Sequence, residues 1–364
     1  MIELYFAVNG PGEIAGWLYP LIRWLKEYSP YWVKHLTFNV ILTPCQFASG
    51  EEENVLRSWN FFNSIIPSHK YWNCFNGKKD NSILFHIGGD LFFNFALSKV
   101  WKSIPIAYIE KEFWVGRFYR RIYSVKDMKL RNSISVGDLR FDFLPDNGFS
   151  ETGKIALFPG SRAYGLKFYI PFYLALVKEL IKDFNNLSFT MFFSPFINKA
   201  IKDKFIEKFK PLFEELPIKV EDLTDMNKVK NYLLAITLPG TNTIQLAYMK
   251  IPMFVVFPLH RPEFIPLEGL ANIFKGKIRE RLIEFYLSRN PYLALPNKLY
   301  PGIVPEIVGK FQLKDVVTFL KNSLYNRKIL LKIHEDLKEK FHKDYLTSEI
   351  IWNDLYDEVL KEIV

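Results

Sequence analysis

The stretch Ile236–Pro258, ITLPGTNTIQLAYMKIPMFVVFP, predicts two parallel strands joined by a short helix. An apolar run over Tyr232–Leu238 ends in Pro239-Gly240, and a second apolar run follows at Met253–Phe257. Both runs are continuous rather than alternating, which is typical of parallel strands that are covered on both faces of a sheet. The stretch therefore predicts a βαβ unit of an α/β protein.

The helix of this unit is expected at Ile244–Met249, with capping side chains supplied by Thr241, Asn242 and Thr243. It begins where the first strand ends. Unpaired backbone N–H groups and the positive end of the helix dipole meet there, and α/β proteins bind anionic ligands at this edge. A nucleotide diphosphate fits such a position.

Length and composition set the outer limits. With 364 residues, 49% of them hydrophobic, the chain is long enough for two folded domains. Lys and Arg total 48 against 39 Asp and Glu, and the resulting charge of +9 favours an anionic partner, either a nucleotide, a lipid surface or a nucleic acid. The 34 Phe and 19 Tyr residues suit a membrane interface, or equally reflect a lineage that uses Phe in place of Leu.

The sequence indicates a cytoplasmic protein with at most a peripheral role on the inner face of the membrane. Cys45 and Cys74 lack the spacing of metal ligands and are expected to stay reduced. The first residues, MIELYFAVNG, lack the features of a signal peptide. The chain also has no run of about 18 uninterrupted apolar residues.

The first half of the chain alternates strands and helices. Strand Glu3–Val8 leads through the turn Asn9–Glu13 into an amphipathic helix at Ala15–Tyr28. The turn does not match the dinucleotide pattern G-x-G-x-x-G, so we do not expect a dinucleotide site there. Further strands are expected at Phe38–Leu42, Ile83–Ile87 and Ile104–Ile109, and further helices at Cys45–Trp59 and Phe92–Trp101.

A polar linker, Pro145–Gly153, separates this series from a second one. The second series has strands at Lys154–Phe158, Leu187–Phe193 and Ile218–Glu221, with helices at Phe168–Phe184 and Asn198–Leu216. The fold class is therefore α/β, with two Rossmann-like domains expected to face a cleft. We place the domains at residues 1–147 and 148–335, followed by charged helices at 336–364.

Four segments, taken in order, resemble those of one known family. Gly12–Gly16 is similar to a Gly-Glu-x-Ser-Gly-Asp turn, with Trp17 in place of Asp, and Leu157–Arg162 matches a Leu-Pro-Gly-Ser-Arg turn. Gly240–Ala247 is similar to a Gly-Thr-Ala-Thr-Leu-Glu element, with Gln245 in place of Glu. The fourth segment, LPN at 295–297 and VPE at 304–306, looks like a Leu-Pro-Asn and Val-Pro-Glu pair, with Gly309 where Gln is usual.

The family that these segments resemble is that of the lipid A disaccharide synthases. The resemblance implies a GT-B fold whose C-terminal helix returns to the first domain. It implies transfer of a GlcNAc-type sugar, acylated or not, from a UDP-linked donor to a lipid-linked or sugar acceptor, with inversion. No metal and no cofactor are implied beyond the UDP-sugar substrate, and no nucleic-acid partner. The departures at Trp17 and Gln245 leave the acceptor and the donor open.

The donor-binding residues that follow from the resemblance lie on two turns and two later loops. Helix N-termini and basic side chains would stabilise the UDP diphosphate, and the guanidinium fork of Arg162 matches phosphate oxygens. Both turns could instead serve packing alone. The residues are Gly160, Ser161, Arg162, Gly240, Thr241, Asn242, Thr243, Gln245, Asn297 and Glu306.

Two carboxylates are candidates for the catalytic base. Asp90, in GGDLFFN after the strand Ile83–Ile87, is the first choice and Glu13 the second, because a base at a strand end of the first domain can reach an acceptor hydroxyl. Asp90 is equally well placed as a helix N-cap. His86 and His260 also lie beside strand ends, where a lone histidine is more often structural.

The segment Asn272–Tyr292 mixes cations with apolar residues, as a basic amphipathic helix on an anionic membrane does. Lys275, Lys277, Arg279 and Arg281 would face the membrane or the acceptor. A core-facing helix with a solvated basic side explains the pattern equally well.

Two other functions remain open. A UDP-sugar epimerase shares the fold, and a non-catalytic protein that binds a nucleotide-sugar or a lipid could retain it. The donor sugar, the acceptor and the oligomeric state do not follow from the sequence.

Overall fold

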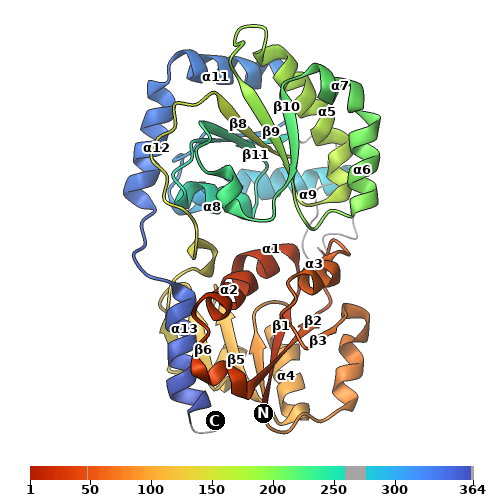
Figure 1. Ribbon diagram of the computed structural model, residues 1–364, viewed down its shortest axis with the longest axis vertical. Coiled ribbons are helices and arrows are strands. Elements are labelled where there is room, and N and C mark those ends of the chain that lie inside the picture. The colour runs from red at the N-terminus through yellow and green to blue at the C-terminus, as the bar shows by residue number, and fades with distance from the viewer. Residues whose placement is uncertain (47, 259–275, 362–364) are drawn as a thin grey trace. The chain divides into compact units, whose positions relative to one another are not determined.

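The computed structural model describes the chain except for residues 47, 259–275 and 362–364 (Figure 1). The chain forms two compact units. Unit 1 comprises Met1–Phe143 together with Asp344–Val364, and unit 2 comprises Leu144–Lys343. The linker expected at Pro145–Gly153 thus lies at the start of unit 2, and the last segment of the chain belongs to unit 1.

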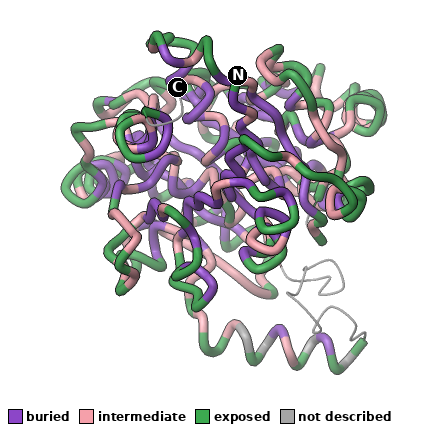
Figure 2. The backbone as a smooth tube through the Cα atoms, turned by 90° about the horizontal axis from the view of Figure 1, so that it is seen from below, coloured by how far each residue is buried: buried purple, intermediate pink, exposed green. Residues whose placement is uncertain are grey.

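Unit 1 is built on a parallel sheet in which each described strand pairs in parallel with its neighbours. Its strands run in the order β3 (Ser64–Ile66), β2 (Leu36–Leu42), β1 (Ile2–Val8), β4 (Ser82–His86), β5 (Ile104–Ile109), β6 (Arg121–Ser124) and β7 (Ser133–Ser135). Five consecutive residues of β1 are buried, as its continuous apolar run requires. Figure 2 colours the backbone by burial, with buried residues in purple and exposed residues in green.

The helical elements of unit 1 follow the strands in sequence. They are α1 (Pro11–Glu13), the π-helix η1 (Ile14–Leu18), α2 (Tyr19–Tyr28), α3 (Glu52–Ser58), α4 (Leu91–Trp101), α13 (Thr347–Leu355), the π-helix η9 (Tyr356–Leu360) and the 3₁₀ helices η2 (Tyr31–His35), η3 (Ser68–Asn76), η4 (Trp114–Phe118) and η5 (Leu139–Phe141). The helix expected over Cys45–Trp59 is confined to α3. The Glu52 carboxylate accepts the N–H groups of Ser49 and Gly50, at 2.5 and 2.9 Å, and so fixes a turn before the helix.

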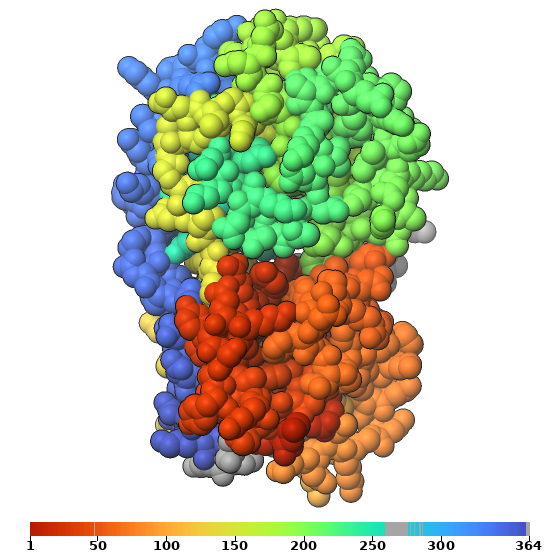
Figure 3. All heavy atoms as spheres, viewed as in Figure 1, coloured from red at the N-terminus to blue at the C-terminus, as the bar shows by residue number. Residues whose placement is uncertain are grey.

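The C-terminal helix α13 packs within unit 1, which confirms the expected return of the chain. Its Trp352 is fully buried, and the ring centroid lies 6.2 Å from that of Phe6 and 5.8 Å from that of Trp32. The Asp142 carboxylate accepts the N–H groups of Thr347 and Ser348, at 2.9 and 2.6 Å, at the start of the helix. In the space-filling view the blue C-terminal segment lies against the red N-terminal residues of this unit (Figure 3).

Unit 2 repeats the parallel arrangement. Its described strands run in the order β10 (Ile218–Asp222), β9 (Ser188–Phe193), β8 (Lys154–Phe158), β11 (Leu234–Thr237), β12 (Met253–Pro258) and β13 (Glu306–Gly309). Its helices are α5 (Ala163–Leu180), α6 (Lys199–Lys208), α7 (Lys210–Glu215), α8 (Thr241–Tyr248), α9 (Gly276–Arg289), α10 (Leu295–Leu299), α11 (Leu313–Tyr325), α12 (Lys328–Lys340) and the 3₁₀ helix η6 (Met226–Val229). The expectation of two Rossmann-like parallel sheets is confirmed. Among the described helices, none has the length and apolarity needed to cross a membrane.

Replacing Trp352 tests how far α13 stabilises unit 1. Because the indole is fully buried among aromatic rings and donates its N–H to the Leu21 carbonyl at 3.0 Å, Trp352→Ala should lower the free energy of unfolding by about 3–5 kcal/mol. Urea titration followed by circular dichroism measures this. Glu349→Ala, at an exposed position of the same helix, should change it little. Equal effects of the two variants would show that α13 is not part of the core.

Candidate functional site

In unit 2 the two glycine turns singled out by the sequence lie side by side. Strands β8 and β11 are adjacent and parallel, with Phe158 paired to Thr237, so the turns that follow them leave the same edge of the sheet. A Cβ atom added to Gly160, whose φ is +91°, would stand 3.0 Å from Leu238 Cδ1. The buried Tyr173 hydroxyl lies 3.0 Å from the carbonyl oxygen of Phe158 and 3.3 Å from that of Ile236, and so ties the two strand ends together.

Each of these turns leads directly into a helix. Arg162 is the N-cap residue of α5, and Gly240, with φ +155°, is the N-cap residue of α8. Neither helix start receives a side-chain capping bond. The N–H groups of Gly165 and Thr243 each donate to the N-cap carbonyl at 3.0 Å, and the earlier amides of the two first turns are suited to a ligand's oxygens. Two positive helix ends therefore lie at adjacent strand ends, with the exposed Arg162 between sheet and helix.

The threonines after Gly240 do not cap α8 as expected, because the helix already begins at Thr241. Thr243 is fully buried in the first turn. Its hydroxyl donates to the Gly240 carbonyl at 2.7 Å and lies 3.2 Å from the N–H of Leu295. It therefore fixes the shape of the turn and joins it to α10. Thr241, Asn242 and Gln245 are partly exposed on the same helix.

Asn297, which is fully buried, and Glu306, which is partly exposed, form a hydrogen-bonded pair next to these turns. The Asn297 side chain exchanges two hydrogen bonds with the backbone of Val304, at 2.9 and 3.0 Å, and donates to Glu306 at 2.8 Å. The other Glu306 oxygen accepts the N–H groups of Leu293 and Ala294, at 2.8 and 2.9 Å. Both side chains thus hold the loop before α10 against β13, and the structure groups them with Thr243.

In unit 1 the corresponding sheet edge carries Glu13. A Cβ atom added to Gly10 would lie 3.1 Å from Glu13 Oε2, and one added to Gly88 would lie 3.1 Å from Glu13 Cγ and 2.3 Å from Asn9 Oδ1. The turns after β1 and β4 approach so closely that only glycine fits between the side chains. Glu13 is consequently held over two strand ends.

The environment of Glu13 favours its protonated form. Burial raises the pKa of the Glu13 carboxyl, and the neighbouring charge of Glu110 raises it further, against the opposing effects of backbone N–H groups and of Arg140. Arg140 is itself bound by two carboxylates. Its guanidinium bonds Asp138 through Nε and Nη2, at 2.7–3.0 Å, and also bonds Glu110. A carboxyl whose pKa is raised toward neutrality is suited to general base catalysis.

Trp17 closes one side of this group. Its ring centroid lies 5.3 Å from that of Tyr108, and the Arg140 guanidinium stands 5.9 Å from it. The indole N–H and Asn9 Oδ1 are buried atoms with no hydrogen-bond partner in the described protein. Buried polar atoms are nearly always paired, which makes these two unpaired atoms unusual.

Asp90 is exposed and caps α4. Its Oδ1 accepts the N–H groups of Phe92 and Phe93, at 2.8 and 3.1 Å. His86 is buried at the end of β4, where burial lowers the pKa of the imidazole to about 3 and Asn94 Nδ2 lies 2.7 Å from its Nδ1. His86 is thus a neutral structural residue. His260 lies outside the described residues.

The basic segment near residue 280 forms α9. Arg281 is exposed on this helix, whereas Arg279 is only 7% exposed and so does not contribute to an exposed basic face. Ile278 and Phe285 are each 58% exposed. Lys275 lies outside the described residues, and for Lys277 only the helical backbone is described.

Sequence reasoning did not assign Glu110, Asp138 and Arg140 to the site. Glu110 directly follows β5, and Asp138 follows β7. A carboxylate directly after a buried strand is a usable signal, because the carboxyl ends of parallel strands share one edge. Nothing in the sequence signals the pairing of Arg140 with Glu110, which are 30 residues apart.

The chain resembles known proteins at a distance. No protein-family model matches it. It is 23% identical over 188 residues to the lipid-A-disaccharide synthase of Wigglesworthia glossinidia brevipalpis, a match that covers 50% of this chain and 45% of the relative, less than half of the relative's length. Among solved structures, MurG of Acinetobacter baumannii superposes with a TM-score of 0.53 at 10% identity, over 97% of this chain and 99% of the other. The UDP-GlcNAc 2-epimerase of Neisseria meningitidis, bound to UDP-GlcNAc, gives 0.53 at 12% identity, over 98% and 100%.

These likenesses extend over nearly the whole length of the solved chains and concern the fold. Together with the two parallel sheets they confirm the GT-B class expected from the sequence. At such low identity they do not transfer an activity.

The pKa of Glu13 has a measurable consequence for stability. A carboxyl with a higher pKa in the folded than in the unfolded state binds its proton more tightly when folded, so its contribution is fully present below the unfolded value of about 4.3 and is lost as pH rises through the folded pKa. Glu13→Gln removes this loss. The free energy of unfolding of the variant should therefore rise relative to the wild type between about pH 4 and about pH 8, as urea titrations would show.

Glu349→Gln, which alters an exposed carboxylate, serves as the matched control and should show a difference from the wild type that does not vary in this way. A Glu13→Gln difference that stays constant with pH would contradict the raised pKa.

Proposed function

We propose that the chain is a glycosyltransferase that moves a GlcNAc-type sugar from a UDP-linked donor to a hydroxyl of a lipid-linked or sugar acceptor. The observation that carries this proposal is the pair of uncapped helix starts at the adjacent ends of β8 and β11 in unit 2, with Arg162 beside them. Two neighbouring helix ends and a guanidinium suit a diphosphate, which carries more charge than one helix end neutralises.

Unit 2 is the donor-binding part in this proposal. Gly160, Ser161 and Arg162 contact one phosphate, and Gly240 and Thr241 the other. Gln245, one turn into α8, accepts hydrogen bonds from the ribose hydroxyls, more weakly than a carboxylate would because its acceptor carries no charge. Asn297 and Glu306 act through the shape of the α8 and α10 turns, as their hydrogen bonds to the backbone suggest.

Unit 1 supplies the base. Glu13 is the better candidate because its pKa is raised, whereas the Asp90 carboxylate is already used in capping α4. Glu13 accepts the proton of the acceptor hydroxyl while the oxygen bonds to the anomeric carbon, and the bond from that carbon to the diphosphate oxygen breaks. UDP departs with the electron pair, and the configuration at the anomeric carbon inverts.

The sequence relative and the solved structures support different parts of the proposal. The relative with detectable sequence identity is named a lipid-A-disaccharide synthase, which supports sugar transfer to an acylated acceptor near a membrane. Trp17 stands where that family has Asp, and its ring lies next to Arg140, which acts on the Glu13 carboxyl. This substitution is the reason to expect a different acceptor. One similar structure is an epimerase holding UDP-GlcNAc, so epimerisation of a UDP-sugar is the second candidate.

The donor site can be tested by calorimetry with UDP and UDP-GlcNAc. The wild type should bind both, and Arg162→Ala should weaken binding roughly ten- to hundredfold, the value of a hydrogen bond to a charged group. Arg289→Ala, an exposed arginine on α9, should leave the affinity unchanged. Failure of the wild type to bind either nucleotide would contradict the proposed donor site. Equal affinity in Arg162→Ala would contradict the proposed role of Arg162.

The base can be tested by the rate of transfer to an acylated glucosamine acceptor. Glu13→Gln should lower kcat roughly a hundred- to ten-thousandfold, with the KM for the donor unchanged. Asp90→Asn is the matched control, because Asn caps a helix as well as Asp does, and it should retain most activity. The opposite ranking would make Asp90 the base.

The same assay without acceptor separates the alternatives. Appearance of a new UDP-sugar in the proton NMR spectrum would establish an epimerase in place of a transferase. Binding of UDP-GlcNAc with neither reaction, over a panel of acylated and free sugars, would support a non-catalytic protein.

A further inference from the structure

Unit 1 carries a row of exposed aromatic side chains that the proposed function does not use. Large apolar side chains exposed to this degree are common singly but not in contact with one another. We call this row the aromatic ridge. It consists of Trp72 of η3, Phe92 and Phe93 of α4, and Trp114 and Phe118 of η4, which are 53, 48, 41, 61 and 49% exposed.

The ridge is continuous. Trp72 contacts Phe93 with ring centroids 5.3 Å apart, Phe93 contacts Phe92 at 5.7 Å, Phe92 contacts Trp114 at 6.3 Å, and Trp114 contacts Phe118 at 6.2 Å. Three separate elements of the chain thus contribute to one apolar surface. The Phe92–Phe93 pair stands in the first turn of α4, with Leu91 between it and the capping residue Asp90.

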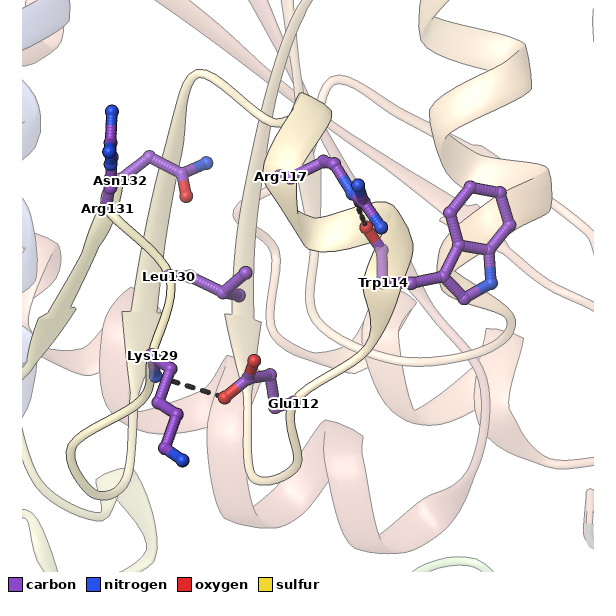
Figure 4. Close-up of a pocket in the computed structure, with 7 residues that line it drawn as sticks. All are labelled: Glu112, Trp114, Arg117, Lys129, Leu130, Arg131 and Asn132. Carbon is purple, nitrogen blue, oxygen red and sulfur yellow. Dashed lines mark hydrogen bonds between the residues drawn. The ribbon is translucent and has the colours of Figure 1, made fainter.

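A basic pocket adjoins the ridge at Trp114. It measures about 720 Å³ and is lined by Glu112, Trp114, Arg117, Lys129, Leu130, Arg131 and Asn132 (Figure 4). Lys129 and Arg131 lie across the pocket from Trp114 (Figure 4). The lining thus includes three cations and one carboxylate, and Glu112 Oε2 accepts the backbone N–H of Lys129 at 3.0 Å.

We infer that the ridge and the basic pocket together seat unit 1 on an anionic phospholipid surface, with a lipid phosphate in the pocket and the ridge in the acyl boundary. The Arg117 guanidinium stands 6.0 Å from the Trp114 ring centroid and 5.7 Å from that of Phe118, so the cation and the apolar surface are joined. Aromatic rings beside cations are the composition that partitions to the boundary between headgroups and acyl chains.

The ring geometry favours a lipid over a single-stranded nucleic acid. Trp72 and Phe93 meet at 87°, Phe92 and Phe93 at 72°, and Trp114 and Phe118 at 90°. In each of these pairs the edge of one ring therefore covers a face of the other. Bases need open ring faces on which to stack, whereas acyl chains need only apolar area.

The inference rests on the proposed function in one respect, which is the purpose of the surface. Asp90 and Gly88 follow β4, and Gly88 packs against Glu13. A lipid seated on the ridge therefore lies near the sheet edge that carries the proposed base. The surface itself stands on the exposed rings and the pocket, whatever the reaction.

Co-sedimentation of the full chain with phosphatidylcholine vesicles, with and without phosphatidylglycerol, tests the inference. Binding should require phosphatidylglycerol and weaken as salt is added. Trp114→Ala should lower the vesicle affinity on the order of tenfold through lost apolar burial. Lys129→Ala combined with Arg131→Ala should lower it roughly twenty-fivefold, at about fivefold per cation. Tyr325→Ala, which removes a 67% exposed ring of unit 2, should have no effect.

Three results would overturn the inference. They are no binding to either vesicle, equal binding by the ridge variants, or loss of binding in Phe285→Ala on α9 with the ridge variants intact. Binding of an oligonucleotide that competes with vesicles and needs Trp114 would assign the ridge to nucleic acid instead. UDP binding to the same variants, measured by calorimetry, shows that they are folded and reports on the donor site separately, since it involves unit 2 alone.

Discussion

Parallel strand pairing is the constraint on which the rest of the structure depends. In each unit every described strand runs the same way as its neighbours, so the turns after the strands all leave one edge of the sheet. Turns far apart in the sequence thereby become neighbours, as Gly160 and Leu238 do in unit 2 and Gly10 and Gly88 do in unit 1. The candidate donor site and the candidate base both result from this arrangement. Close packing against glycines also determines how firmly a side chain such as that of Glu13 is held.

Much of this arrangement is readable from the sequence. Continuous apolar runs such as Met253–Phe257 mark buried parallel strands, and Pro-Gly turns mark where they end. The pairing of the PGSR turn with the turn at Gly240 follows once β8 and β11 are known to be neighbours. Errors arose where local contacts outweighed the pattern, as when the Glu52 side chain fixed a turn and shortened the expected helix. Thr243, which was expected to cap the helix, is instead a fully buried residue of the first turn of α8.

The remainder depends on contacts between distant residues. Arg140 is bound by Asp138 and Glu110, and only the folded sheet brings Glu110 and Arg140 near Glu13. The exposure of Trp114 and Phe118 is equally invisible in sequence, because these residues look like ordinary core residues until their neighbours are placed. Burial and exposure are properties of the packed chain, and both the raised pKa of Glu13 and the aromatic ridge arise from them.

The return of the C-terminal helix has a consequence for synthesis of the protein. Unit 2 is continuous in sequence, from Leu144 to Lys343, whereas unit 1 needs α13, near the end of the chain. On the ribosome, the first 143 residues emerge early but lack Trp352, which fills their aromatic core. The part of the chain made first is therefore completed last, and its sheet must stay partly uncovered while the whole of unit 2 is translated. Its apolar surface is then a natural target for chaperones during elongation.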